Sequence, residues 1–246
     1  MHRFYVSREQ IKGNTIIING RDVNHIRNVL RMKPGDGLVI SDGQGKDYYC
    51  IIKCGCENEI TAEICYTRDA DYELTVRITL FQGLPKSDKM EMVIQKAVEL
   101  GAYEIVPVMT ARSVVRLSDE KKEEKKLLRW QAISESAAKQ SGRGIIPGIH
   151  PVMSFKEAVD YAKKLDWAVI PYENAEGMKG TKELLEKIRE CKTAGIIIGP
   201  EGGFEDYEVE LARENGIPPI SLGRRILRTE TAGLALLSML LLYLEE

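Results

Sequence analysis

The spacing of apolar residues changes near residue 70, and this change constrains the fold more strongly than any other feature of the chain. Before it, short apolar runs are separated by turn residues, which is typical of strands in a small barrel. After it, short apolar runs alternate with longer stretches of helical periodicity. Strands that alternate with helices favour a mainly parallel sheet with helices on both sides. We therefore predict a small β-rich domain at 1–71 and an α/β domain at 72–246.

The same pattern places the individual elements. In the first domain, the one helical segment spans 22–32, and its single apolar face is made of Val23, Ile26, Val29 and Leu30. The strands of this domain are predicted at 15–18, 38–40, 48–53 and 60–66. In the second domain, strands are predicted at 76–80, 105–109, 167–171, 194–198 and 219–222, and helices at 89–100, 119–140, 155–164, 182–190, 205–215 and 229–244.

Charge is distributed unevenly along the chain. The formal net charge of −2 shows no overall basic excess of the kind common in nucleic-acid-binding domains. The first 35 residues nevertheless contain seven basic and two acidic side chains, whereas residues 36–73 contain three basic and nine acidic ones. The N-terminal end is therefore expected to attract phosphate groups locally.

Cysteine usage and hydropathy indicate the compartment. The five cysteines are an odd number, which argues against a disulfide framework and favours a reducing cytoplasm. Cys50, Cys54 and Cys56 lie close together, but they lack paired C-x2-C spacing and a nearby histidine, so we expect no metal site. The most apolar stretch, 234–244, is shorter than the ~20 residues of a membrane span. We expect it to form a buried terminal helix or a subunit interface in a cytoplasmic protein.

Two glycine-containing turns follow predicted strands near the end of the chain. The first is Gly199-Pro200-Glu201-Gly202-Gly203, and the second begins at Ser221-Leu222-Gly223. Glycines allow a ligand to approach the backbone closely, and ligands of open α/β sheets bind at the carboxyl ends of strands. The two turns are therefore predicted to form one small-molecule pocket, although ordinary strand-to-helix turns would show similar spacing. The patterns of dinucleotide folds, P-loops, serine hydrolases and zinc peptidases do not occur.

Several longer motifs resemble those of a known family. They include L-P-K-S-D-K at 84–89, G-P-E-G-G at 199–203 and L-G-R-R-I-L-R-T-E-T-A at 222–232. In these motifs the chain is similar to the SPOUT methyltransferases, and within them to the RsmE family, which methylates N3 of uridine in 16S ribosomal RNA. Ser87 and Gly233 depart from the family pattern, in which glycine and proline are common at these two positions.

The resemblance implies a domain arrangement, a cofactor and partners. We expect a PUA-like RNA-binding domain at 1–71 and a trefoil-knotted SPOUT domain at 72–246. The implied cofactor is S-adenosylmethionine, and the implied partners are 16S rRNA of the small ribosomal subunit and a second copy of the chain in a homodimer. Two alternatives remain open: a SPOUT enzyme that acts on another RNA, and a non-catalytic RNA-binding assembly factor.

The resemblance and the chemistry of methyl transfer also suggest site residues. Arg228 is the candidate for stabilising negative charge on the pyrimidine, and Glu201 and Glu230 are candidate proton acceptors whose pKa a desolvated pocket would raise. Glu230 also fits a simpler role in the first turn of a helix. The predicted cofactor contacts are Pro171, Ile198, Gly199, Pro200, Gly202, Ser221, Leu222, Gly223, Ile226, Leu227, Arg228, Thr231 and Ala232. The predicted RNA contacts are Arg3, Arg27, Arg31, Lys86, Lys89, Lys96, Arg112, Arg116, Lys139 and Arg143.

Overall fold

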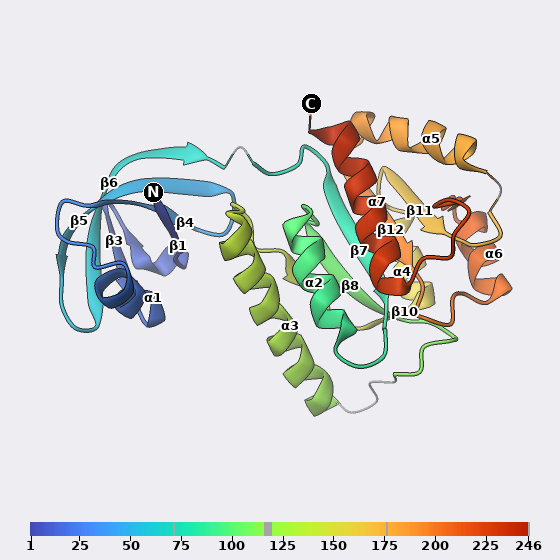
Figure 1. Ribbon diagram of the computed structural model, residues 1–246, viewed down its shortest axis with the longest axis horizontal. Helices are drawn as coiled ribbons and strands as arrows, with labels where there is room; N and C mark the ends of the chain where they lie inside the picture. Colours follow the sequence, from blue (N-terminus) through green and yellow to red (C-terminus); the bar gives the residue numbers. More distant parts are fainter. Residues whose placement is uncertain (71, 116–119, 176, 246) are drawn as a thin grey trace. The chain divides into compact units, whose positions relative to one another are not determined.

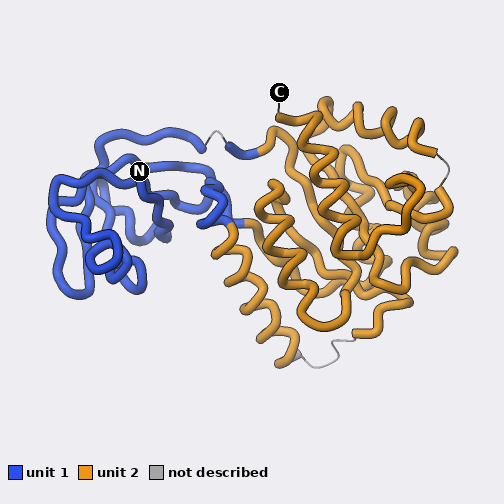
Figure 2. Tube along the Cα trace, viewed as in Figure 1, with its two compact units in different colours: residues 1–73, 138–146 blue, residues 74–137, 147–246 orange. Residues whose placement is uncertain are grey.

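The computed structural model describes residues 1–70, 72–115, 120–175 and 177–245 (Figure 1). Its contacts divide the chain into two compact units (Figure 2). The first contains residues 1–73 together with 138–146, and the second contains 74–137 together with 147–246. The expected fold class, a small β-rich domain followed by an α/β domain with a mainly parallel sheet, is confirmed.

The first unit is built on a six-stranded sheet with the order β1-β4-β5-β6-β3-β2. Neighbouring strands are antiparallel except β1 and β4, which are parallel. Ile16, Leu38 and Ile40 are fully buried on the face that forms the core. The strands are β1 His2–Tyr5, β2 Ile11–Lys12, β3 Thr15–Asn19, β4 Gly37–Ser41, β5 Lys46–Gly55 and β6 Glu59–Asp69. The short strands β1 and β2 were not predicted, because each offers too few residues for a recognisable alternation.

The helical segment of the first unit differs from the prediction in one respect. An α-helical turn, α1 (Arg21–Asn24), continues as a π-helical turn, η2 (His25–Val29). Val23 and Ile26 are buried as predicted, but Val29 is 64% exposed, so its assignment to the apolar face was wrong. The π turn contains more residues per turn than an α-helix, and it therefore rotates Val29 away from the core.

Residues 138–146, which are the end of the long helix α3 (Glu120–Ser141) and the segment after it, belong to the first unit. Glu73 joins this segment to the end of the β-rich region. Its Oε1 accepts the backbone N–H groups of Gly144 and Ile145 at 2.9 and 3.1 Å, and its carboxylate forms an ion pair with Arg143, which is 6% exposed. A buried arginine with a carboxylate partner serves the packing of this unit, because neither charge is left uncompensated.

The second unit is built on a parallel sheet with the order β10-β8-β7-β12-β11-β13, with β9 paired to β8. Helices α2 and α7 cover one face, and α4 and α6 cover the other (Figure 1). The strands are β7 Arg77–Gly83, β8 Glu104–Met109, β9 Gly148–Ile149, β10 Met153–Ser154, β11 Trp167–Pro171, β12 Thr193–Ile198 and β13 Pro219–Ile220. The other helices of this unit are α2 Lys89–Glu99, α4 Phe155–Ala162, α5 Met178–Glu186, the 3-10 helix η3 Lys187–Glu190, α6 Asp206–Glu214 and α7 Thr229–Leu244.

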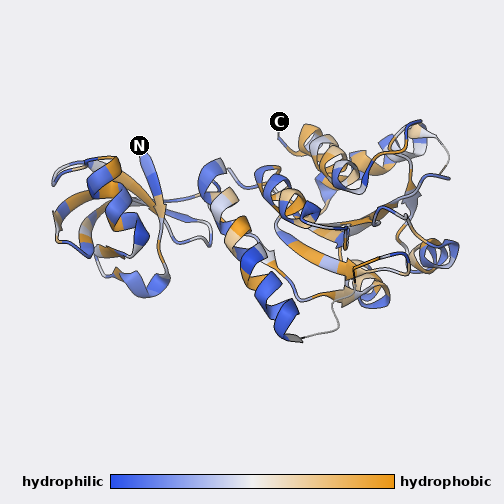
Figure 3. Cartoon of the chain, turned by 60° about the horizontal axis from the view of Figure 1, so that its bottom comes forward, coloured by the Kyte–Doolittle hydropathy of each residue, from blue (hydrophilic) through white to orange (hydrophobic). Residues whose placement is uncertain are grey.

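The central strands of this sheet are buried on both faces. In β12, Ile196 and Ile197 have no exposed surface although they point to opposite sides. Such strands have near-continuous apolar sequences, which is why this one was recognised from its sequence. The outer helices are more polar, and Figure 3 shows hydrophilic residues dominating the first turns of α3. Within the described residues, no helix is long and apolar enough to cross a membrane.

Candidate functional site

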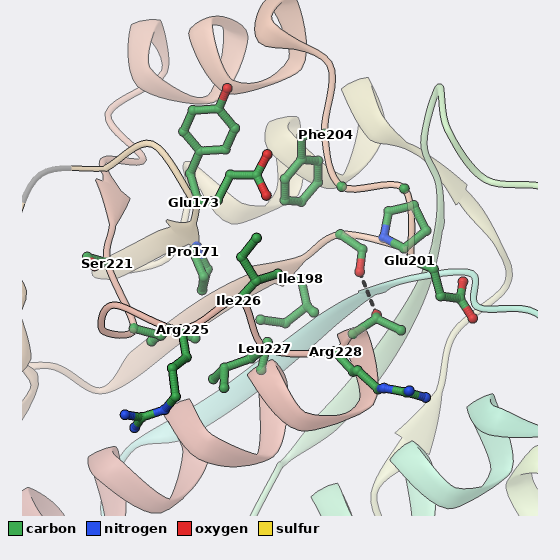
Figure 4. Close-up of a pocket in the computed structure, with 18 of the residues that line it drawn as sticks. Pro171, Glu173, Ile198, Glu201, Phe204, Ser221, Arg225, Ile226, Leu227 and Arg228 are labelled. Carbon is green, nitrogen blue, oxygen red and sulfur yellow. Dashed lines mark hydrogen bonds between the residues drawn. The ribbon is translucent and has the colours of Figure 1, made fainter.

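A cavity of about 490 Å³ opens at the carboxyl ends of β11, β12 and β13, which are neighbours in the sheet (Figure 4). Two loops form most of its wall. We call residues 199–203, which follow β12, the glycine loop, and residues 222–228, which connect β13 to α7, the arginine loop. The cavity therefore lies where the general rule for ligands of parallel sheets places it.

Every predicted cofactor contact except Thr231 lines this cavity. Thr231 is exposed on α7 outside the cavity, because its neighbours at the start of the helix, Thr229 and Ala232, occupy the inner side. Further lining residues were not predicted as cofactor contacts: Lys89, Tyr172, Glu173, Gly203, Phe204, Arg224, Arg225 and Thr229. Tyr172 and Glu173 directly follow β11, so the strand-end rule could have found them if it had been applied to this strand as well.

The glycine loop is held from behind by the end of β7. Thr229 Oγ1 donates a hydrogen bond to the carbonyl of Gly199 at 2.5 Å and accepts one from Gln82 Nε2 at 2.8 Å. A Cβ atom on Gly83 would lie 2.7 Å from the backbone nitrogen of Pro200. Only glycine permits this backbone-to-backbone approach, so the position of the loop depends on residue 83.

Lys89 connects the two predicted proton acceptors. Its Nζ lies 3.0 Å from Glu201 Oε1 and 3.4 Å from Glu230 Oε2. Glu201 also accepts the backbone N–H of Lys86 at 3.1 Å. Burial acts to raise the pKa of Glu201, but the hydrogen bonds from Lys89 and from the backbone outweigh it, and the pKa lies below its ordinary value. The expectation that the pocket raises this pKa was therefore wrong for Glu201.

Arg112 holds the other end of the glycine loop. Its guanidinium donates to the carbonyl of Gly202 at 2.9 Å and to both carboxylate oxygens of Glu205 at 2.9 and 3.1 Å. Glu208 adds a further connection, because it accepts the backbone N–H groups of Ala111 and Glu205 at 2.9 and 3.0 Å. The glycine loop is thus fixed along its whole length before any ligand binds.

The arginine loop has a different character. Ser221, which directly precedes this loop, is fixed by Thr181, whose Oγ1 accepts the N–H of Ser221 at 3.1 Å and donates to its carbonyl at 2.9 Å, and Gly223 adopts a φ of +112°. Within the described part of the chain, the backbone N–H groups of residues 224–227 make no hydrogen bond. Ile226 is 84% exposed although it is apolar. These free groups are available to a ligand in the cavity.

Arg228 lies where the arginine loop enters α7. Its carbonyl accepts the N–H groups of Thr231 and Ala232 at 2.8 and 2.9 Å, and its side chain is exposed. No ion pair or hydrogen bond of its guanidinium is found among the residues that the structure describes. Arg225 and Arg228 extend in different directions from the loop (Figure 4). The guanidinium of Arg228, the candidate for stabilising charge on the pyrimidine, therefore belongs to a residue that lines the cavity and has no partner among the described residues.

The predicted RNA contacts of the first unit are mostly engaged within that unit. Arg3 pairs with Asp47 at 2.8 Å, and Arg27 donates to the carbonyl of Cys56 at 2.7 Å. Arg31 is exposed and adopts a φ of +54°, which is uncommon for a residue with a side chain. Two further candidates have partners in this unit, Lys139 over the ring of Tyr5 and Arg143 paired with Glu73.

The predicted RNA contacts of the second unit also include both engaged and exposed side chains. Lys96 pairs with Glu99 at 2.8 Å, whereas Lys86 is exposed and offers its backbone N–H, not its ammonium group, to Glu201. Lys89 and Arg112 are engaged at the glycine loop as described above. Arg116 lies outside the described residues.

Comparison with known proteins identifies the family. Residues 72–241 match the model of an RNA methyltransferase domain, and residues 18–65 match that of an RNA methyltransferase PUA domain. The chain is 35% identical over 244 residues to ribosomal RNA small subunit methyltransferase E of Bacillus subtilis, with 97% of this chain and 95% of the relative covered. The chain belongs to this family of RNA methyltransferases.

Solved structures of the methyltransferase family show the same fold. The methyltransferase E of Neisseria gonorrhoeae, solved bound to S-adenosyl methionine, has a TM-score of 0.83 and 32% identity over 98% of this chain and 97% of its own. A putative methyltransferase of Legionella pneumophila, solved in complex with the same cofactor, has a TM-score of 0.82 and 32% identity over 98% and 96% of the two chains. The resemblance inferred from the motifs is confirmed.

Proposed function

We propose that this protein transfers a methyl group from S-adenosylmethionine to N3 of one specific uridine in the 16S rRNA of the small ribosomal subunit. The observation that carries the proposal is the cavity at the ends of β11, β12 and β13, enclosed by one fixed loop and one loop with free backbone groups. Membership of the methyltransferase E family supports the choice of reaction and of substrate.

The cavity fits the proposed cofactor in size and chemistry. Its volume of about 490 Å³ lies within the range of small-molecule sites, roughly 300–1,000 Å³. Ile198, Leu227 and the exposed Ile226 offer apolar surface for an adenine ring, and the glycines of both loops let a ligand reach the backbone. The free N–H groups of residues 224–227 suit the polar atoms of a nucleoside.

The protein's contribution to the reaction is mainly to position the reactants. The bound cofactor would supply a methyl group on a sulfonium, whose sulfur leaves as a neutral thioether when a nucleophile attacks the methyl carbon in line. The glycine loop, fixed by Thr229, Lys89 and Arg112, holds its side of the cavity in one conformation, so that little entropy is lost when the reactants align. The target base must leave its stack to present N3, as other modified bases do.

Charge and proton handling fall to Arg228 and Glu201, which line the cavity, and to Glu230, which does not line it but pairs with Lys89 of the cavity wall. We propose that Arg228 stabilises negative charge on the pyrimidine while N3 loses its proton. Glu201 is a weak proton acceptor because Lys89 and a backbone N–H lower its pKa. Glu230 makes one ion pair, at 3.4 Å, and is therefore the better candidate of the two carboxylates.

The partners and the location complete the proposal. Arg31 and Lys86 are exposed and suited to bind phosphate groups of the RNA. Leu242 of α7 is 77% exposed, and this apolar helix is our candidate for the interface of a homodimer. We further propose that the chain acts in the cytoplasm and that its RNA-binding domain ends near residue 71.

Methylation of isolated ribosomal subunits tests the function. Small subunits from a strain that lacks the modification are incubated with the enzyme and cofactor labelled in the methyl group, and the labelled nucleotide is mapped. Incorporation at N3 of a single 16S uridine is the expected result. Incorporation into tRNA alone would favour a different RNA substrate, and absence of cofactor binding by calorimetry would favour a non-catalytic assembly factor.

A further inference from the structure

Arg112 was expected to bind RNA phosphate, but three of the five N–H donors of its guanidinium are already engaged, one by Gly202 of the glycine loop and two by Glu205. Nε and Nη2 donate to the two oxygens of Glu205 at 2.9 and 3.1 Å, and Nη1 donates to the carbonyl of Gly202 at 2.9 Å. Arg112 itself does not line the cavity, whereas Gly202 does. The side chain therefore touches the cavity wall from its outer side.

The geometry of this contact requires an arginine. Two parallel N–H donors match the two oxygens of a carboxylate, and a third donor on the same plane reaches the carbonyl. A lysine has the same charge but lacks the planar fork, so it cannot make the three contacts together. The backbones are also close, because a Cβ on Gly202 would lie 3.1 Å from the Cβ of Arg112.

The contact connects two segments that are far apart in sequence. Glu205 stands directly before helix α6, and its own N–H is bound by Glu208 at 3.0 Å. Glu208 also accepts the N–H of Ala111 at 2.9 Å and is 1% exposed. The loop after β8 and the start of α6 therefore bind each other reciprocally, with the end of the glycine loop between them.

We propose that Arg112 is a positioning residue that holds the glycine loop in its cofactor-binding conformation, and that it is not an RNA ligand. The proposal rests on the proposed function, in which this cavity binds S-adenosylmethionine. Arg112 acts through Gly202 and Glu205 and does not touch the cofactor. Loss of its fork leaves the loop with more conformations, and cofactor binding must then select one of them.

The substitution Arg112→Lys separates the two roles, because it keeps the positive charge and removes the fork. If Arg112 positions the loop, the Kd for S-adenosylmethionine measured by calorimetry on the full chain rises about three- to tenfold, as expected when charged hydrogen bonds at a partly exposed site are lost. Arg112→Gln gives a similar loss. In steady-state kinetics the KM for the cofactor rises while kcat changes little.

Arg213→Lys on α6 is a matched control. Arg213 pairs with Glu210 at 2.9 Å on the exposed side of the same helix and makes no contact with the glycine loop. This variant leaves the Kd for the cofactor unchanged. The double variant Arg112→Lys with Glu205→Gln loses less affinity than the sum of the two single changes, because both remove the same contact.

RNA binding supplies the contrasting measurement. The affinity of Arg112→Lys for a 16S rRNA fragment, and the dependence of that affinity on salt, remain those of the wild type. Unchanged cofactor affinity in both Arg112 variants, with weaker RNA binding and a shallower salt dependence for Arg112→Gln, overturns the proposal in favour of a phosphate contact. If the wild-type protein binds RNA but no S-adenosylmethionine, the proposed function itself is overturned. This result differs from the failure of the Arg112 proposal, in which the wild type still binds the cofactor.

Discussion

Alanine at position 83 would place a methyl group where the backbone of the glycine loop already lies. The added Cβ would be 2.7 Å from the nitrogen of Pro200 and 2.9 Å from both the carbonyl carbon of Gly199 and the carbonyl oxygen of Ile198. Ordinary contacts of a Cβ atom begin at 3.4 Å, so the closest separation must open by 3.4 − 2.7 = 0.7 Å. All three neighbours are backbone atoms, and none of them can move away by changing a rotamer.

The required movement affects both stability and the site. Gly83 ends β7, whose neighbouring residue Gln82 pairs with Ile198 of β12, so the shift must separate the two central strands where they meet the cavity. Overpacking of this kind costs about 2 kcal/mol, which lowers Tm by roughly 4–8 °C in a chain of this size. Because the glycine loop moves with the strand end, cofactor affinity falls as well.

Thermal unfolding followed by circular dichroism, together with calorimetric titration of S-adenosylmethionine, measures both effects of Gly83→Ala. The matched control is Gly180→Ala in helix α5, where an added Cβ meets no atom within 4 Å. Alanine in a helix is favoured over glycine, so this control gains about 0.5–1 kcal/mol and keeps its cofactor affinity. If Gly83→Ala unfolds and binds cofactor as the wild type does, the close approach does not determine the position of the loop.

Three further substitutions test other parts of the second unit. Thr229→Val removes the hydroxyl between Gln82 and the glycine loop, and urea denaturation should show a loss of about 1–3 kcal/mol, because buried polar groups lose their partner. Glu104 and His150 form an ion pair at 2.8 Å. Burial acts to raise the pKa of Glu104, but hydrogen bonds from His150, Tyr161 and Thr79 lower this pKa to about 2. The contribution of Glu104 to the stability of the fold is therefore present above pH 4.5 and is lost as the pH falls from there towards 2. The hydrogen bond to Glu104 raises the pKa of His150 above 6.5. The stability lost in His150→Gln should therefore be largest below pH 6.5 and decrease as the pH rises through the raised pKa. A stability difference between wild type and variant that grows with pH would contradict this. Arg228→Gln should lower kcat by about 100-fold with little change in the Kd for the cofactor, because it removes an electrostatic contact to the transition state. An equal loss of cofactor affinity would instead assign Arg228 to cofactor binding.

Much of the fold and the core of the site were predictable because their causes are local in sequence. The apolar run of β12, the helical periodicity of α2 and the strongly apolar sequence of α7 appear in their own residues. A strand buried on both faces and a helix with one buried face require the first two of these patterns. The two loops were also recognised, because glycine next to a strand end is a local feature. Helix α5 shows the limit of this approach, because it begins at Met178 and not near 182, with Gly180 obscuring its first turn.

The partners of the charged side chains were decided by the tertiary structure. Arg112 and Glu205 lie 93 residues apart in sequence, and Lys89 and Glu201 lie 112 apart. Nothing in the neighbouring residues of Arg112 or Lys89 distinguishes an arginine or lysine that holds a loop from one that binds phosphate. The energy of an ion pair depends on distance and burial, and both quantities exist only once the sheet has brought the ends of β7, β8 and β12 together. The sequence by itself determined which residues form the strands, helices and glycine turns, and the folded chain decided which of its charges remain free to act on a substrate.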